Sequence, residues 1–85
     1  MKAISKVHLH SSKDLLSQRE REVLFLLARG LSNKEMANRM GLSTRTIDRH
    51  IASMFMKMQV NSRTRAVLKA LRQGVLSLQD IAEFQ

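Results

Sequence analysis

The sequence contains no cysteine, no proline, no tryptophan and no tyrosine. The lack of cysteine excludes disulfide bonds, thiolate metal sites and a cysteine nucleophile. Because proline is absent and there are only three glycines, little in the chain interrupts a helix. The only aromatic residues are three phenylalanines, so the chain lacks the stacking platforms of single-strand and RNA-binding sheets. These absences favour an all-helical protein.

Length and charge narrow the class of protein further. At 85 residues the chain can form one small domain with a single core. No apolar run approaches the roughly 20 residues of a membrane helix, and the start lacks the apolar region of a signal peptide. We therefore expect a soluble, cytoplasmic protein with no membrane partner. The chain carries 15 Lys/Arg against 7 Asp/Glu, a net charge of +8, which favours a polyanionic partner such as duplex nucleic acid.

Four segments combine a helix-start signal with apolar residues at helical spacing. Segments 17–20 and 32–35 both read Ser-x-x-Glu, the pattern of a capping box. We predict a compact all-α fold with helices over 18–29, 33–40, 44–58 and 63–73. Residues 1–15 are expected to form a basic arm or linker remnant, and residues 75–85 a short extension with one or two helical turns. The third segment has the clearest apolar stripe: Ile47, Ile51, Met54, Phe55 and Met58.

The second and third predicted helices are spaced as in a helix-turn-helix. Ala37 is small where two helices must approach closely, and Gly41 follows where the turn favours positive φ. Ile47 is placed to anchor the second helix on the first. On a helical wheel the face opposite Ile47 carries Arg45, Arg49 and Ala52, with Asp48 at its border, and Met56 also points outward.

Several stretches resemble the LuxR/GerE-type DNA-binding domain. They are Leu-Ser-Gln-Arg-Glu-Arg-Glu-Val-Leu at 16–24, Ala-Arg-Gly-Leu-Ser-Asn-Lys-Glu-Met-Ala at 28–37, Leu-Ser-Thr-Arg-Thr-Ile-Asp-Arg-His at 42–50, and Lys-Met-Gln-Val-Asn-Ser-Arg-Thr-Arg-Ala at 57–66. The resemblance extends over 16–74 without a gap. It implies a four-helix domain that binds DNA as a dimer and regulates transcription, with neither enzymatic activity nor a cofactor.

Base recognition is expected from the outer face of the third helix. In a helix-turn-helix the N-terminal part of the second helix reads base edges in the major groove. The expected base-reading residues are Arg45, Asp48, Arg49 and Ala52. Arg49 can donate hydrogen bonds from two guanidinium nitrogens to O6 and N7 of a guanine. Asp48 departs from the lysine usual in the family. The acid either accepts from cytosine N4, holds Arg45 or Arg49 in position, or rotates aside and only lowers affinity.

Phosphate contacts position such a domain without reading sequence. The start of the second helix offers backbone amides and a positive dipole end to a phosphate. Hydroxyl and cationic groups elsewhere on the motif can act similarly, although ordinary solvated charge is the alternative for Lys34 and Arg63. The expected phosphate-binding residues are Ser32, Asn33, Lys34, Thr44, Thr46, Lys57 and Arg63.

The fourth helix raises a question about self-association. The family resemblance makes it a dimer contact, yet its outward Arg65, Lys69 and Arg72 would repel their copies across a two-fold axis. Val67, Ala70 and Leu71 of this helix are expected to point inward. We expect a weak homodimer whose interface uses the apolar edge of the helix, and the alternative is a monomer that dimerises only on its DNA site. The interface residues expected there are Ala66, Leu68, Ala70 and Leu71.

Two other functions stay open on the sequence alone. The chain can be a protein-interaction module, a truncated regulator that pairs with a full-length relative or with RNA polymerase. It can also be a sigma-factor-like promoter-recognition region, although segment 61–66 favours the regulator. Metal binding by His8 and His10 is not expected, because no third ligand has suitable spacing. The leading prediction is a transcriptional regulator that binds duplex DNA as a dimer on an inverted repeat, in the cytoplasm and on the nucleoid of a bacterium.

Overall fold

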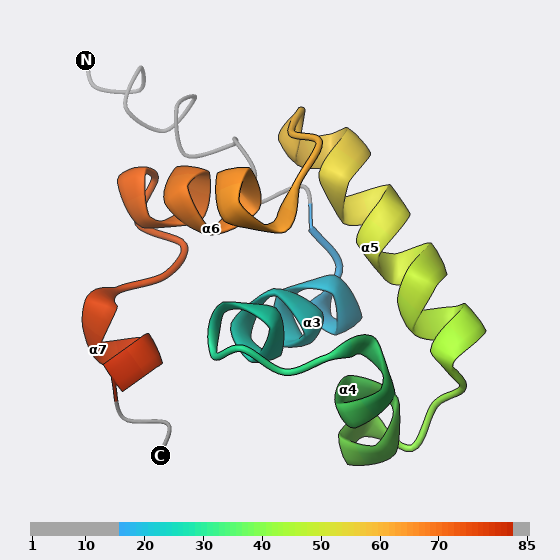
Figure 1. Ribbon diagram of the computed structural model, residues 1–85. Coiled ribbons are helices and arrows are strands. Elements are labelled where there is room, and N and C mark those ends of the chain that lie inside the picture. The colour runs from blue at the N-terminus through green and yellow to red at the C-terminus, as the bar shows by residue number, and fades with distance from the viewer. Residues whose placement is uncertain (1–15, 83–85) are drawn as a thin grey trace.

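The chain is described by a computed structural model over residues 16–82, and this part contains five α-helices (Figure 1). They are α3 Gln18–Ala28, α4 Asn33–Met40, α5 Thr44–Met58, α6 Arg63–Arg72 and α7 Leu78–Ala82. The predicted all-α fold is confirmed, with the first and fourth helices ending one residue earlier than expected. Within 16–82 no helix has the length and apolarity needed to cross a membrane. The predicted arm over residues 1–15, with His8 and His10 in it, lies outside the described residues.

Serine side chains begin the first four of these helices. Ser17, Ser32, Ser43 and Ser62 each accept a hydrogen bond from the backbone amide three residues later, at 3.0–3.1 Å. Both predicted capping boxes are present, because Glu20 and Glu35 accept in return from the cap amides. These caps fix where each helix starts, and therefore which side chains of the helix-turn-helix lie at its surface.

The turn between α4 and α5 depends on a left-handed glycine. Gly41 has a φ of 69°, a conformation that costs other residues free energy. The amide of Leu42 then donates to the Ala37 carbonyl at 2.9 Å, which closes the end of α4. The chain reverses within three residues, so α5 can pack across α4 as the helix-turn-helix pattern predicts.

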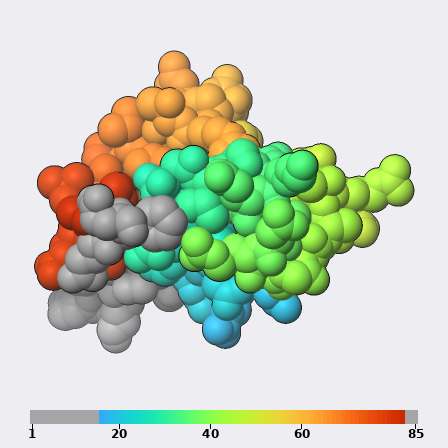
Figure 2. Space-filling model, turned by 60° about the horizontal axis from the view of Figure 1, so that its bottom comes forward, coloured from blue at the N-terminus to red at the C-terminus, as the bar shows by residue number. Residues whose placement is uncertain are grey.

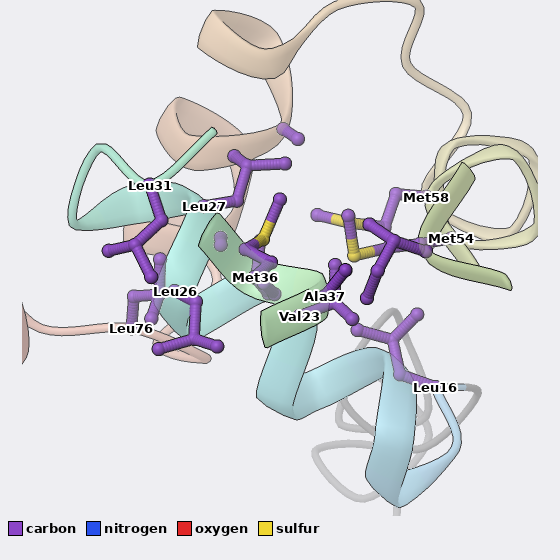
Figure 3. Close-up of a cluster of buried hydrophobic side chains, with 14 residues drawn as sticks. Leu16, Val23, Leu26, Leu27, Leu31, Met36, Ala37, Met54, Met58 and Leu76 are labelled. Carbon is purple, nitrogen blue, oxygen red and sulfur yellow. The ribbon is translucent and has the colours of Figure 1, made fainter. Parts of the chain in front are cut away.

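The core lies around α3, which occupies the centre of the fold (Figure 1). Figure 3 shows Met54 and Met58 pointing from α5 toward Ala37 of α4, while Leu26 and Leu76 meet at the other end of the cluster. Ile47, Met54 and Met58 are buried as the apolar stripe predicts, with Ile51 and Phe55 partly buried beside them. The inward face of α5 is thus fixed.

α6 is rotated about its own axis from the orientation that the sequence predicts. Val67, Ala70 and Leu71 are expected to point inward, but the fully buried residues are Ala66 and Ala70. Val67 and Leu71 are only partly buried at the sides of this contact. A side chain as small as alanine lets α6 approach the core closely, so the burial is centred on the two alanines.

Candidate nucleic-acid interface

The outer face of α5 is where the sequence predicts base contacts. Arg45, Asp48, Arg49 and Ala52 are all exposed, while Ile47 on the opposite side has no exposed surface. Met56 continues the same exposed face toward the C-terminal end of the helix. Figure 1 shows α5 along the right side of the fold, with α3 and α4 to its left. The structure therefore leaves this row of side chains accessible to a partner.

Asp48 is exposed but already has a protein partner. Its Oδ1 accepts a hydrogen bond of 2.7 Å from Nδ2 of Asn33, the first residue of α4. The Asn33 Oδ1 in turn accepts from the Arg63 guanidinium, and Arg63 also donates to the Leu31 carbonyl at 3.3 Å. A chain of three side chains thus joins the N-terminal parts of α4, α5 and α6. Figure 2 shows α4, in green, lying between α6, in orange, and α5, in yellow-green.

The first turns of the helices differ in charge. Glu20 and Glu35 stand in the first turns of α3 and α4, whereas those of α5 and α6 hold no acidic residue. The positive dipole ends of α5 and α6 are therefore not neutralised from within the helix. Thr44 is exposed at the start of α5, and the Thr46 hydroxyl lies 3.0 Å from the Ser43 hydroxyl. Both threonines lie in the first turn of α5, and their contact with a phosphate stays a prediction.

The start of α4 is less open than its sequence suggests. The Ser32 amide donates to Glu35 at 2.8 Å, and the Ser32 hydroxyl accepts from the Glu35 amide. Lys34 is exposed beside them. Because Glu35 satisfies the cap amide and partly offsets the dipole, a phosphate here would depend mainly on Lys34.

Lys57 forms an ion pair with Glu20, a buried acid that the sequence pattern predicts only as part of a capping box. Its Nζ lies 2.9 Å from Oε1 of Glu20, whose residue is 4% exposed. Burial alone would raise the pKa of the Glu20 carboxyl, but hydrogen bonds from the Ser17 amide, Lys57 and Ser53, with the charge of Lys57, hold that pKa below its ordinary value. The pair ties the end of α5 to the start of α3, and the phosphate role of Lys57 stays a prediction.

The expected dimer surface on α6 needs a correction. Ala66 and Ala70 have no exposed surface, because both pack into the core of the same chain. They cannot contact a second copy without unfolding. Leu68 is 49% exposed and Leu71 is partly exposed, so these two residues remain available.

A basic groove surrounds Leu68. Arg65, Leu68, Lys69 and Arg72 of α6 line it together with the loop segment 59–61. Lys69 also donates from Nζ to the Met58 carbonyl at 2.6 Å, where it stabilises the C-terminal end of α5. Among residues 16–82 no group of three His, Asp or Glu side chains could hold a metal ion.

The fold and this surface define a class of protein, the helix-turn-helix DNA-binding domains. The sequence matches the family described as "Bacterial regulatory proteins, luxR family" over residues 14–70, more than half of the chain. The chain therefore belongs to this family.

Individual relatives agree with that assignment. The chain is 42% identical over 67 residues to the spore germination protein GerE of Bacillus subtilis. This match covers 79% of this chain and 90% of GerE. It is 33% identical over 63 residues to the response regulator protein VraR of Staphylococcus aureus and of Staphylococcus epidermidis. That match covers 74% of this chain but spans only 30% of the length of VraR.

Proposed function

We propose that the chain recognises a specific sequence of duplex DNA by placing α5 in the major groove. The observation that carries the proposal is the row of exposed side chains in the N-terminal half of α5, Arg45, Arg49 and Ala52, opposite the buried anchor Ile47. Arg45 and Arg49 would donate to base edges, and Ala52 would contact a thymine methyl. Asp48 lies on the same face, and its hydrogen bond with Asn33 supports a positioning role instead of a base contact.

Phosphate contacts would hold the domain on the duplex on both sides of α5. Lys34 at the start of α4 and Arg63 at the start of α6 are exposed, and Thr44 stands at the start of α5. Ser32, Asn33, Thr46 and Lys57 stay in the proposed set. Each of these four, like Arg63, already has an intramolecular hydrogen bond with which a phosphate would have to coexist. Such contacts supply affinity that depends on salt, without reading sequence.

We further propose that two copies bind an inverted repeat, on the nucleoid in the bacterial cytoplasm and without enzymatic activity. Half-sites read by two such helices lie about one helical turn apart, ~34–36 Å. Leu68 and Leu71 are the apolar residues of α6 that a second copy can reach. Because Arg65 and Arg72 flank Leu68 on the same surface, the dimer is expected to be weak until DNA phosphates offset these charges.

The test is a selection from a pool of random duplexes followed by anisotropy titration at ~150 mM salt. We expect the selected duplex to bind at least ~10-fold more tightly than random duplex, and two protein chains to bind each selected site. Equal binding of both duplexes would contradict sequence recognition and favour the protein-interaction module. A stoichiometry of one chain per site would contradict binding to an inverted repeat, but it would leave sequence recognition intact.

A further inference from the structure

We propose that Asp48 is a positioning residue, which sets the specificity of DNA recognition by fixing α5 against the starts of α4 and α6. The inference rests on the proposed function, because it assumes that α5 reads bases. It assigns Asp48 a task different from that of Arg45 and Arg49, which share its face of the helix.

The orientation of the Asn33 amide follows from the chemistry of its two neighbours. Arginine can only donate hydrogen bonds, and an ionised carboxylate can only accept them. The Asn33 oxygen must therefore face Arg63, and its NH2 group must face Asp48, as the structure has them. No other orientation of the amide satisfies both partners, so the three side chains form one directed chain from α6 through α4 to α5.

The residue type at position 48 decides whether this chain is complete. A carboxylate or an amide oxygen there can accept from Asn33 Nδ2, but alanine cannot and lysine has only donors. The hydrogen bond of 2.7 Å is short, as expected for an ionised acceptor. Asp48 is exposed on α5, but its carboxylate oxygen meets Asn33 of α4, so the side chain is directed toward α4 and not along the row of Arg45 and Arg49.

Charge gives a second reason for the pairing. An acid in the DNA-facing surface repels phosphates unless a cation offsets it, and the repulsion grows as DNA excludes water. Arg63 lies one side chain away and links to Asp48 through Asn33. The Arg63 guanidinium also holds the Leu31 carbonyl, which precedes the α4 cap. The acid is thus compensated within the protein, and its position fixes the angle at which Arg45 and Arg49 meet the groove.

The test measures specificity as the ratio of dissociation constants for random and selected duplex. Asp48→Ala removes the acceptor and the charge, whereas Asp48→Asn removes the charge but keeps an acceptor oxygen. We expect Asp48→Ala to lower the ratio about fivefold, the size of one lost exposed hydrogen bond, and Asp48→Asn to keep it within about twofold while both duplexes bind more tightly. Glu22→Gln on α3 is the matched control for loss of one negative charge, and the ratio should stay unchanged.

Variants of Asn33 test whether Asp48 acts through its hydrogen bond with this residue. We expect Asn33→Ala to lower the ratio as Asp48→Ala does, and the double variant to lose no more than either single variant, because both break one chain. In the free protein, an NMR correlation spectrum should show the Asn33 side-chain amide shifted in Asp48→Ala and close to its wild-type position in Asp48→Asn. Melting temperatures measured in parallel exclude a general loss of folding.

Three results would overturn the inference. An unchanged ratio in Asp48→Ala would show that the residue does not affect specificity. A changed preference confined to one base pair, in Asp48→Ala and Asp48→Asn alike, would make Asp48 a base reader. Additive losses in the double variant would show that Asn33 and Asp48 act separately. Failure of the proposed function looks different, because wild-type chain would then bind both duplexes equally.

Discussion

The ion pair between Glu20 and Lys57 offers the sharpest test of how α5 is held against α3. Lys57→Met keeps the aliphatic side chain and removes the ammonium, leaving Glu20 with its other donors in a site that is 4% exposed. A hydrogen bond to a charged group contributes ~1.5–3 kcal/mol. Because the Lys57 side chain is 37% exposed, the lower end applies, and we expect a loss of about 1.5 kcal/mol in the free energy of unfolding. For a domain of this size that lowers Tm by about 6–12 °C.

The sign of the pH dependence follows from the pKa of Glu20. The folded state holds this pKa below the ordinary value of 4.5, so ionised Glu20 stabilises the fold at pH above that value. The contribution is lost as pH falls through the folded-state pKa. The difference between wild type and Lys57→Met should therefore be full at pH 7 and should shrink below pH 4.5.

Urea unfolding followed by circular dichroism measures these free energies at each pH. A double-mutant cycle with Glu20→Gln isolates the coupling between the two side chains, since it removes the separate effect of Lys57 on the helix dipole. Lys34→Met, the same change at an exposed lysine of α4, is the matched control and should leave Tm nearly unchanged. A destabilisation by Lys57→Met that is equally large at pH 7 and pH 3 would refute the electrostatic reasoning. Unchanged stability with weaker DNA binding would make Lys57 a phosphate contact instead.

The remaining predictions concern DNA binding and self-association. Arg49→Ala should weaken binding to the selected duplex by ~1–3 kcal/mol and relax the preference at one base position, as a repeated selection would show. Lys34→Ala should weaken binding to all duplexes alike and lower the slope of log K against log salt by ~0.9; equal behaviour of these two variants would undo the division between base and phosphate contacts. Leu68→Glu should convert two chains per site into one in sedimentation on the selected duplex, and an unchanged stoichiometry would place the dimer contact elsewhere.

The fold follows closely from local sequence signals. A serine begins each of the first four described helices, and the left-handed glycine that ends α4 lies where the sequence pattern places it. The periodic stripe on α5 correctly predicts that Ile47 and Met54 are buried. The rotation of α6 is the part that periodicity misses, because Val67 and Leu71 are more apolar than the alanines. Only close approach to the core favours Ala66 and Ala70, and a one-dimensional pattern does not contain that distance.

Helical periodicity also predicts which side chains of the site are exposed, but it does not predict the polar contacts between helices. A helical wheel places Arg45 and Arg49 opposite the anchor, and both are exposed. Asn33 and Asp48 are 15 positions apart and Glu20 and Lys57 are 37 apart, so no local signal pairs them. Each pair forms because the α4–α5 turn and the α3–α5 packing bring two helix ends together. The capping-box pattern singles out Glu20, but it does not show that the Glu20 carboxylate is buried, and it is the burial that calls for a cation such as Lys57.

These contacts change what the net charge means for DNA binding. Arg63, Arg65, Lys69 and Arg72 make α6 the most basic part of the chain, yet Lys69 stabilises the end of α5 and Arg63 takes part in the Asp48 chain. The charge of Lys57 is likewise offset by a carboxylate whose lowered pKa keeps it ionised. We therefore expect a count of basic residues to overestimate the number of phosphates that the domain neutralises, because several of its cations already contact protein groups. If α5 reads bases as proposed, the same cations would serve recognition indirectly, by holding α5 in place.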